Sequence, residues 1–130
     1  MAKTNATQRT LKELRDQGWN CCIVERYMNH PGMKFPRRVD AFNIGDLLAC
    51  RPGVVLEGVY EPPCIALVQC FPDSGGNAGF DAHREKILAN KETGIWLRAG
   101  GKIFLYGWKL RGKKGRKRWE WKREEVVFGA

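Results

Sequence analysis

Short apolar runs alternate with polar, glycine-rich and proline-rich segments along this chain. Residues 4–17 predict a helix, because Leu11 and Leu14 form an apolar stripe between charged positions and Gly18 follows as a stop. Further helices are predicted at 80–90 and 93–99. Runs typical of strands cover 19–24, 47–50, 64–71, 103–110 and 119–128, and 54–60 is apolar enough to be another strand or an extended loop.

This order of elements defines the expected fold class. A length of 130 residues favours one domain, spanning 1–130, with a single core. Helices interspersed with strands predict an α/β domain in which a central mixed β-sheet is flanked by helices. The glycine-containing segment 112–115 separates the last two strands, so we expect a C-terminal β-hairpin over about 103–128.

Positive charge is concentrated in that hairpin. The chain has 23 Lys and Arg against 14 Asp and Glu, a formal net charge of +9. Segment 109–123 holds nine basic residues and one acidic residue, so it carries eight of those nine net charges. Such a patch is typical of phosphate-backbone binding, although a solvated hairpin that resists edge aggregation is the alternative. The residues expected to grip phosphates are Lys113, Lys114, Arg116, Lys117 and Arg118, with Arg37 and Arg38 as a second, smaller patch.

Two tryptophans lie within the basic segment. Trp119 and Trp121 alternate with Glu120 and Lys122, so both point to the same face of a strand. We expect that face to belong to the core rather than to a base-stacking platform.

The cysteines and histidines indicate neither a disulfide framework nor zinc. Five cysteines are present without a CxxC pair, and the two histidines, His30 and His83, lack zinc-ligand spacing to any of them. Buried free thiols in a reducing cytosol are therefore expected. No segment is long and apolar enough to span a membrane, and the N-terminus does not read as a signal peptide.

Oxygen ligands for a hard cation flank two of the apolar runs. Asp46 precedes the strand at 47–50, and Gln69 lies near the end of the strand at 64–71. Pairing of these strands would bring the two side chains together, and such a pair can hold Mg²⁺ or Mn²⁺. Candidates for a third ligand are Asp40, Glu25 and Glu13.

This order of elements and polar residues resembles the PD-(D/E)XK nuclease superfamily, and most of all archaeal-type Holliday junction resolvases and small phage-encoded relatives. Gly45-Asp46 is similar to the family's Pro-Asp, and Gln69-Cys70-Phe71 to its (Glu/Gln)-x-Lys. Glu13 matches the glutamate of the family's first helix. The resemblance covers roughly residues 8–110 and implies a restriction-endonuclease-like fold.

Two positions depart from the family pattern. Gln69 replaces the commoner glutamate and brings no charge, and Phe71 stands where the family has the lysine that orients or activates the attacking water. Lys86 or Arg84 on the following helix is the expected substitute for this lysine.

The resemblance implies a magnesium-dependent endodeoxyribonuclease acting on branched DNA such as Holliday junctions, with a homodimer supplying two symmetric sites. Asp46, Gln69, Asp40, Glu25 and Glu13 would form the site with Lys86 or Arg84. DNA would be recognised through its backbone or shape, without a small-molecule cofactor. The expected setting is cytoplasmic, near the nucleoid or in a phage-infected cell. Two alternatives remain: a degenerate nuclease fold that binds DNA without cutting it, and a phage protein that docks on an acidic host partner.

Overall fold

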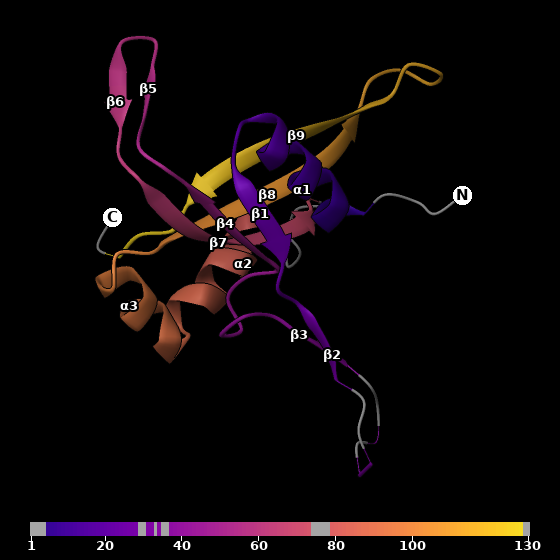
Figure 1. Ribbon diagram of the computed structural model, residues 1–130. Coiled ribbons are helices and arrows are strands. Elements are labelled where there is room, and N and C mark those ends of the chain that lie inside the picture. The colour runs from indigo at the N-terminus through magenta and orange to yellow at the C-terminus, as the bar shows by residue number, and fades with distance from the viewer. Residues whose placement is uncertain (1–4, 29–30, 33, 35–36, 74–78, 129–130) are drawn as a thin grey trace.

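A five-stranded mixed sheet, in the order β1-β4-β7-β8-β9, lies at the centre of the molecule (Figure 1). The computed structural model describes residues 5–28, 31–32, 34, 37–73 and 79–128. Strands β7 and β8 are parallel, and the other neighbouring pairs are antiparallel. The strands of this sheet are β1 (Asn20–Ile23), β4 (Leu47–Arg51), β7 (Cys64–Pro72), β8 (Lys102–Arg111) and β9 (Arg118–Glu125).

Helices cover both faces of this sheet. Helix α1 (Ala6–Asp16) packs on one face, and α2 (Phe80–Leu88) and α3 (Lys91–Arg98) pack on the other (Figure 1). The Asn5 side chain caps α1 by accepting a hydrogen bond from the backbone N–H of Gln8. The expected α/β class, with helices flanking a mixed sheet, is therefore confirmed. None of the helices in the described residues has the length and apolarity needed to span a bilayer.

Side chains of β7 alternate between two cores. Val68 and Cys70 point to the α1 side, where they pack with Leu14, Trp19 and Tyr106. Leu67 and Phe71 point to the opposite side and pack with residues that include Ile44, Ile87, Ile103 and Leu105. Because both faces of the strand are buried, its sequence is a nearly continuous apolar run.

Two further hairpins project from the sheet as arms (Figure 1). The first arm pairs β2 (Arg26–Met28) with β3 (Arg37–Val39), and the second pairs β5 (Val54–Leu56) with β6 (Val59–Glu61). The strand predicted at 19–24 is confirmed by β1, but the first arm was not predicted from the sequence. The segment 54–60, predicted as one strand or an extended loop, instead folds into the second arm. The second arm turns at Glu57 and Gly58, which both have positive φ, and a glutamate there is an uncommon hairpin signal.

Burial corrects two other expectations. Trp119 and Trp121 are 44% and 39% exposed, and they meet polar side chains of α1: the Arg9 guanidinium lies 3.7 Å from the centre of the Trp119 ring, and Trp121 donates to Glu13. All five cysteines are free, and Cys21 and Cys70 are buried as expected. Cys22, however, is exposed, because it points to the uncovered face of the edge strand β1.

Candidate metal centre at the end of the sheet

Three carboxylates meet where β1, β4 and the first arm converge. Glu25 directly precedes β2, Asp40 directly follows β3, and Asp46 directly precedes β4. One carboxylate oxygen from each lies within 4.8 Å of one from each of the others. Since Arg26 pairs with Val39, Glu25 and Asp40 stand opposite each other one residue beyond the paired strands, at the base of the arm.

A tight loop fixes Asp40 and Asp46 relative to each other. Ala41 and Gly45 close this loop through two backbone hydrogen bonds, of 3.0 and 3.4 Å. The Asn90 side chain, between α2 and α3, donates to the carbonyl oxygens of Phe42 and Asn43 and ties the loop to the helices. This role of Asn90 could not be predicted from the sequence, because an asparagine between two helices usually indicates only a helix cap, which Asn90 also provides for α3.

Gly45 explains how Asp46 comes so close to β7. A Cβ atom at this position would lie 2.9 Å from the backbone nitrogen of Val68 and 3.0 Å from its carbonyl oxygen. The loop therefore packs directly on the backbone of β7, and the backbone N–H of Asp46 donates to the Val68 carbonyl at 2.9 Å. Glycine is the residue that permits such an approach.

Asp46 is the most buried of the three carboxylates, with 4% of its surface exposed. Its Oδ2 atom accepts a hydrogen bond of 2.9 Å from the backbone N–H of Cys70. The pKa of Asp46 is raised to about 8, first by burial, then by a hydrogen bond with Asp40 and by the negative charges of Asp40 and Glu25. The Cys70 N–H acts in the opposite direction. At neutral pH this site therefore holds a proton or needs a cation.

Gln69 completes the group. With its amide nitrogen turned towards the loop, it donates to the Ile44 carbonyl oxygen at 2.8 Å and to Asp40 Oδ2 at 3.0 Å. If the Gln69 amide turned over, its oxygen would take the place of this nitrogen and would be a neutral ligand beside Asp40. An amide flip therefore converts Gln69 from a donor to Asp40 into a ligand for a shared cation.

The titration of Asp46 predicts how stability depends on pH when divalent cations are removed. The folded pKa lies near 8 and the unfolded value near 3.8, so between these values the folded state holds a proton that the unfolded state lacks. Stability should therefore fall as pH rises, by about 1 kcal/mol per pH unit between pH 6.5 and 8.

Chemical denaturation in EDTA at several pH values checks this slope. Burial lowers the pKa of His83, which makes stability rise with pH up to about 7.5 and so opposes the Asp46 slope in the lower part of the window. The Asp46→Asn variant keeps His83 and should lose the downward slope, so the difference between the two proteins isolates Asp46. Stability that stays constant or rises between pH 6.5 and 8 would contradict the assigned proton.

Phe71, the residue compared with a lysine of the PD-(D/E)XK pattern in the sequence, belongs to an aromatic stack. Phe71 is buried and lies two residues after Gln69 on the same face of β7. The His83 ring of α2 stacks on it at 4.0 Å between ring centroids, and the Phe80 ring meets it edge-on at 4.9 Å. Phe71 thus anchors α2 and has no group that can handle a proton.

The structure separates the two candidate substitutes for that lysine. Arg84 binds both Glu124 carboxylate oxygens and Asp81, so its guanidinium is held at β9. Lys86 is exposed and makes no ion pair with any residue in the described ranges. Its positive charge contributes to lowering the pKa of His83, which places it near the ring that stacks on Phe71.

Glu13 lies apart from the three carboxylates. It accepts hydrogen bonds from Trp121 Nε1 at 2.8 Å and from Gln17. Helix α1 packs on the face of the sheet opposite Gln69 and Phe71, so Glu13 faces β9 instead of the carboxylates. Of the predicted ligands, the structure groups Glu25, Asp40, Asp46 and Gln69, and leaves Glu13 outside the group.

Two projecting elements flank this group. The first arm begins and ends at Glu25 and Asp40, and its strand β3 contains Arg37 and Arg38, whose side chains lie outside the described ones. The ribbon formed by β8 and β9 continues past the end of β7 and carries the exposed basic loop, residues 112–117 (Figure 1). The glycine-rich segment 73–79, which the sequence predicts to be a loop at the mouth of the site, falls largely outside the described residues.

No protein-family model, curated protein or solved structure matches this chain. The three carboxylates, joined by the Gln69 amide oxygen after the amide flip, would form an all-oxygen donor set, which suits Mg²⁺ or Mn²⁺ rather than a softer metal. The raised pKa of Asp46 shows that negative charge is unfavourable at this point, and a bound cation would compensate the charge that the proton now neutralises.

Proposed function

We propose that this protein is a metal-dependent endonuclease of the PD-(D/E)XK type that acts on DNA, with branched DNA as the expected substrate. One observation carries the proposal: Glu25, Asp40, Asp46 and Gln69 converge at the end of the sheet from which the first arm and the basic ribbon project. An acidic centre flanked by basic elements matches what phosphodiester hydrolysis requires, because the phosphates need positive charge while the reaction needs a cation.

The order of the site residues supports the family assignment. Asp46 precedes β4, Gln69 lies in the neighbouring strand β7, and β8 runs parallel to β7 after two helices. In the PD-(D/E)XK pattern the aspartate comes first, the glutamate or glutamine follows on the next strand, and a helix comes after it. The order here is the same. The restriction-endonuclease-like arrangement, and the C-terminal hairpin as its DNA-binding extension, are part of this proposal.

Asp46, Asp40, Glu25 and Gln69 would hold the cation. A bound Mg²⁺ would polarise the scissile phosphate and lower the pKa of a nearby water. Asp46 would lose its proton when the cation binds, so cation affinity should rise with pH up to about 8. Lys86 would orient the attacking water in place of the missing lysine, since Arg84 is held by Glu124.

A second candidate function follows from Phe71. If Lys86 does not reach the phosphate, the fold has no lysine at its reaction centre, and the protein would bind DNA without cutting it. The same acidic centre would then serve only to position a cation between the protein and the backbone. Cleavage separates this candidate from the nuclease.

A cleavage assay tests the proposal directly. Labelled four-way junctions, flaps and linear duplexes are incubated with the protein in Mg²⁺, in Mn²⁺ and in EDTA. We expect cutting that requires the cation and prefers the branched substrates. The Asp40→Ala variant, purified in parallel, controls for contaminating nucleases and should be inactive. Binding without cutting in either cation would replace the nuclease with the second candidate.

A further inference from the structure

An apolar strip lies exposed on the ribbon, directly before the basic loop. Trp119 and Leu110, which pair across β8 and β9, are each 44% exposed, and Trp121 is nearly as exposed. Residues paired directly across two antiparallel strands share a face, so the three side chains form one strip. The buried Trp108 pairs with Trp121 and donates its indole N–H to Thr10 at 2.8 Å. Helix α1 therefore covers the start of this face and leaves its end open.

The two exposed indoles are held in different ways. Trp121 is anchored twice, because its Nε1 donates to Glu13 at 2.8 Å and its ring lies 5.3 Å from the buried Tyr106 ring, centroid to centroid. Trp119 makes no hydrogen bond through its indole N–H to any residue that the structure describes. The Arg9 guanidinium covers one face of its ring, 3.7 Å from the ring centre. Trp119 is thus supported from one side and still has exposed ring surface for a ligand.

Positive charge surrounds this strip. Segment 111–118, which joins the two strands beyond Leu110, contains six basic residues and no acidic one. Glu120 pairs with Arg111 and Arg118, and the other four basic side chains of the segment pair with no acidic residue in the described ranges. Arg9 adds a positive charge against the Trp119 ring itself. A ligand that complements this surface is anionic and also presents a flat apolar face.

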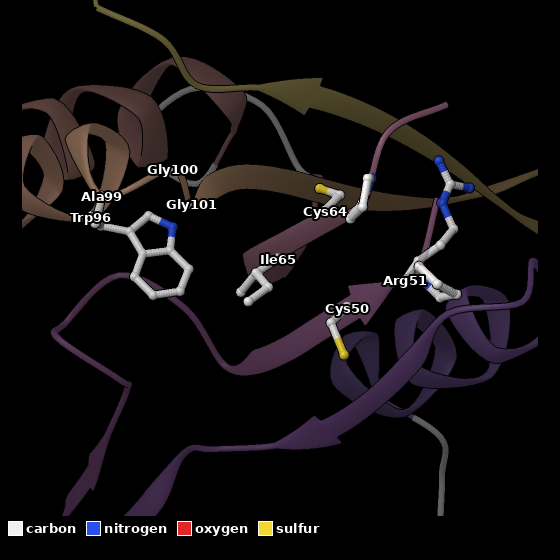
Figure 2. Close-up of a pocket in the computed structure, with 10 residues that line it drawn as sticks. Cys50, Arg51, Cys64, Ile65, Trp96, Ala99, Gly100 and Gly101 are labelled. Atoms are coloured by element: carbon white, nitrogen blue, oxygen red, sulfur yellow. The ribbon is translucent and has the colours of Figure 1, made fainter. Parts of the chain in front are cut away.

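A second aromatic surface lacks this charge. Trp96 and Ile65 lie on either side of a groove of about 450 Å³ between the end of β4, the start of β7 and the end of α3 (Figure 2). Arg51 is the one charged residue in its described lining, and the guanidinium lies over the Trp19 ring, 4.6 Å from the ring centre. The groove adjoins the start of β8, whereas the basic segment follows its end. Of the two surfaces, the strip at Trp119 combines an aromatic ring with charges for phosphates.

We infer that Trp119 stacks on an unpaired base of DNA whose backbone is held by segment 111–118. Aromatic side chains beside positive charge are typical of proteins that bind single strands, because every base has a flat π-face and every nucleotide has a phosphate. A base inside a duplex already has neighbours on both faces, so Trp119 can stack only where the duplex is interrupted, as at a flap or a branch point.

This inference rests on the DNA-binding part of the proposed function and deepens it. It assigns the preference for branched DNA to one side chain, in place of recognition through the backbone or shape alone. The expectation that the face of Trp119 and Trp121 belongs to the core is corrected by the same exposure.

Fluorescence polarisation with labelled oligothymidylate and with a linear duplex tests the stacking. Both are measured in EDTA, so that cleavage does not intervene. Trp119→Ala should bind oligothymidylate about tenfold or more weakly, because one stacked base is lost, and should bind the duplex within about twofold of the wild type. Its salt dependence should be unchanged, because no phosphate contact is removed.

Two further variants control this comparison. Trp119→Tyr keeps a ring that can stack and should retain most of the affinity for oligothymidylate. Tyr60→Ala removes a ring that is 60% exposed from the second arm, where residues 52–63 include no basic residue, and should bind as the wild type does. All three variants should give the circular dichroism spectrum of the wild type.

The outcomes separate the inference from the nuclease proposal. If Trp119→Ala binds oligothymidylate as the wild type does, or loses single strand and duplex equally, the inference is overturned and the nuclease proposal stands. A selective loss in a protein that cuts no DNA in Mg²⁺ supports the stacking and overturns the nuclease. A wild type that binds neither DNA overturns both, and binding to polyglutamate would then indicate an acidic protein partner. Tighter binding to oligouridylate of equal length would assign the site to RNA and overturn the inference for DNA.

Photochemical cross-linking locates the contact. An oligothymidylate in which 5-iododeoxyuridine replaces one thymidine bonds under ultraviolet light to an aromatic ring stacked on it, with loss of hydrogen iodide. After trypsin digestion, mass spectrometry should find the added nucleotide on peptide 119–122, and fragmentation should place it on Trp119. Cross-links confined to Trp121 or to Tyr60 would count against Trp119 as the stacking residue.

Discussion

Replacing Asp46 with asparagine should make the protein more stable in EDTA at pH 8 and, at the same time, unable to cut DNA. The wild-type carboxyl has a pKa of about 8 because it is buried beside Asp40 and Glu25. In the unfolded chain it is fully ionised at that pH, so folding must work against its charge. Asparagine has nearly the same shape and no charge. Its oxygen can accept from the Cys70 N–H, and its nitrogen can donate to Asp40.

The expected gain in the free energy of unfolding is larger at pH 8 than at pH 5 by on the order of 3 kcal/mol, and it should vanish below about pH 4, where the unfolded carboxyl is protonated as well. With Mg²⁺ the order reverses, because a cation that binds only the folded wild type stabilises it by mass action. Cleavage should fall about 10³-fold or more, since the cation contributes several kcal/mol to such reactions.

Denaturation curves in EDTA and in Mg²⁺, together with cleavage rates, measure both effects. Asp16→Asn is the matched control, because Asp16 is an exposed acid on α1 that pairs with Lys12. It should leave the cation-dependent stabilisation and the cleavage rate unchanged. If the Asp46→Asn variant is less stable than the wild type in EDTA at pH 8, the buried charge of Asp46 does not destabilise the folded protein, and the raised pKa on which this prediction rests is wrong.

The central part of the site could be predicted from the sequence because it follows from strand patterning. Leu47 to Cys50 and Cys64 to Phe71 are apolar runs long enough for strands, and their pairing brings Asp46 and Gln69 together. The choice among third ligands was beyond the sequence. Glu25 and Asp40 meet because β2 pairs with β3. Each of these strands has only three residues, which is too short for the alternation of apolar and polar residues that predicts a strand.

The position of Glu13 could not be predicted from the sequence either, for a different reason. Its spacing on α1 agrees with the family pattern, yet the face of the sheet that receives α1 is decided by packing. Leu11 and Leu14 dock on the side of Trp19 and Tyr106, and Glu13 then reaches Trp121. Prolines also flank the second arm. They predict a local turn, but they do not predict the direction in which the arm leaves the sheet.

Neutralising three charges of the basic loop should weaken DNA binding about 10²–10³-fold at 100 mM salt. Lys114, Arg116 and Lys117 are exposed, and none of them pairs with an acidic residue among those that the structure describes. Arg118 differs, because it shares Glu120 with Arg111 and is partly neutralised. The triple variant Lys114→Gln/Arg116→Gln/Lys117→Gln therefore removes charges that are available to phosphates while the ion pairs of the ribbon remain.

The salt dependence of binding to a four-way junction identifies these contacts as phosphate contacts. Each one lost lowers the slope of log affinity against log salt by about 0.9, so the triple variant should lose up to about 2.7. The control Lys91→Gln/Arg98→Gln/Lys102→Gln removes the same number and kinds of charge from α3 and the start of β8, far from the basic loop. Equal losses in both variants would mean that DNA responds only to net charge. A selective loss in the loop variant would assign the basic ribbon as the element that holds the DNA beside Asp46.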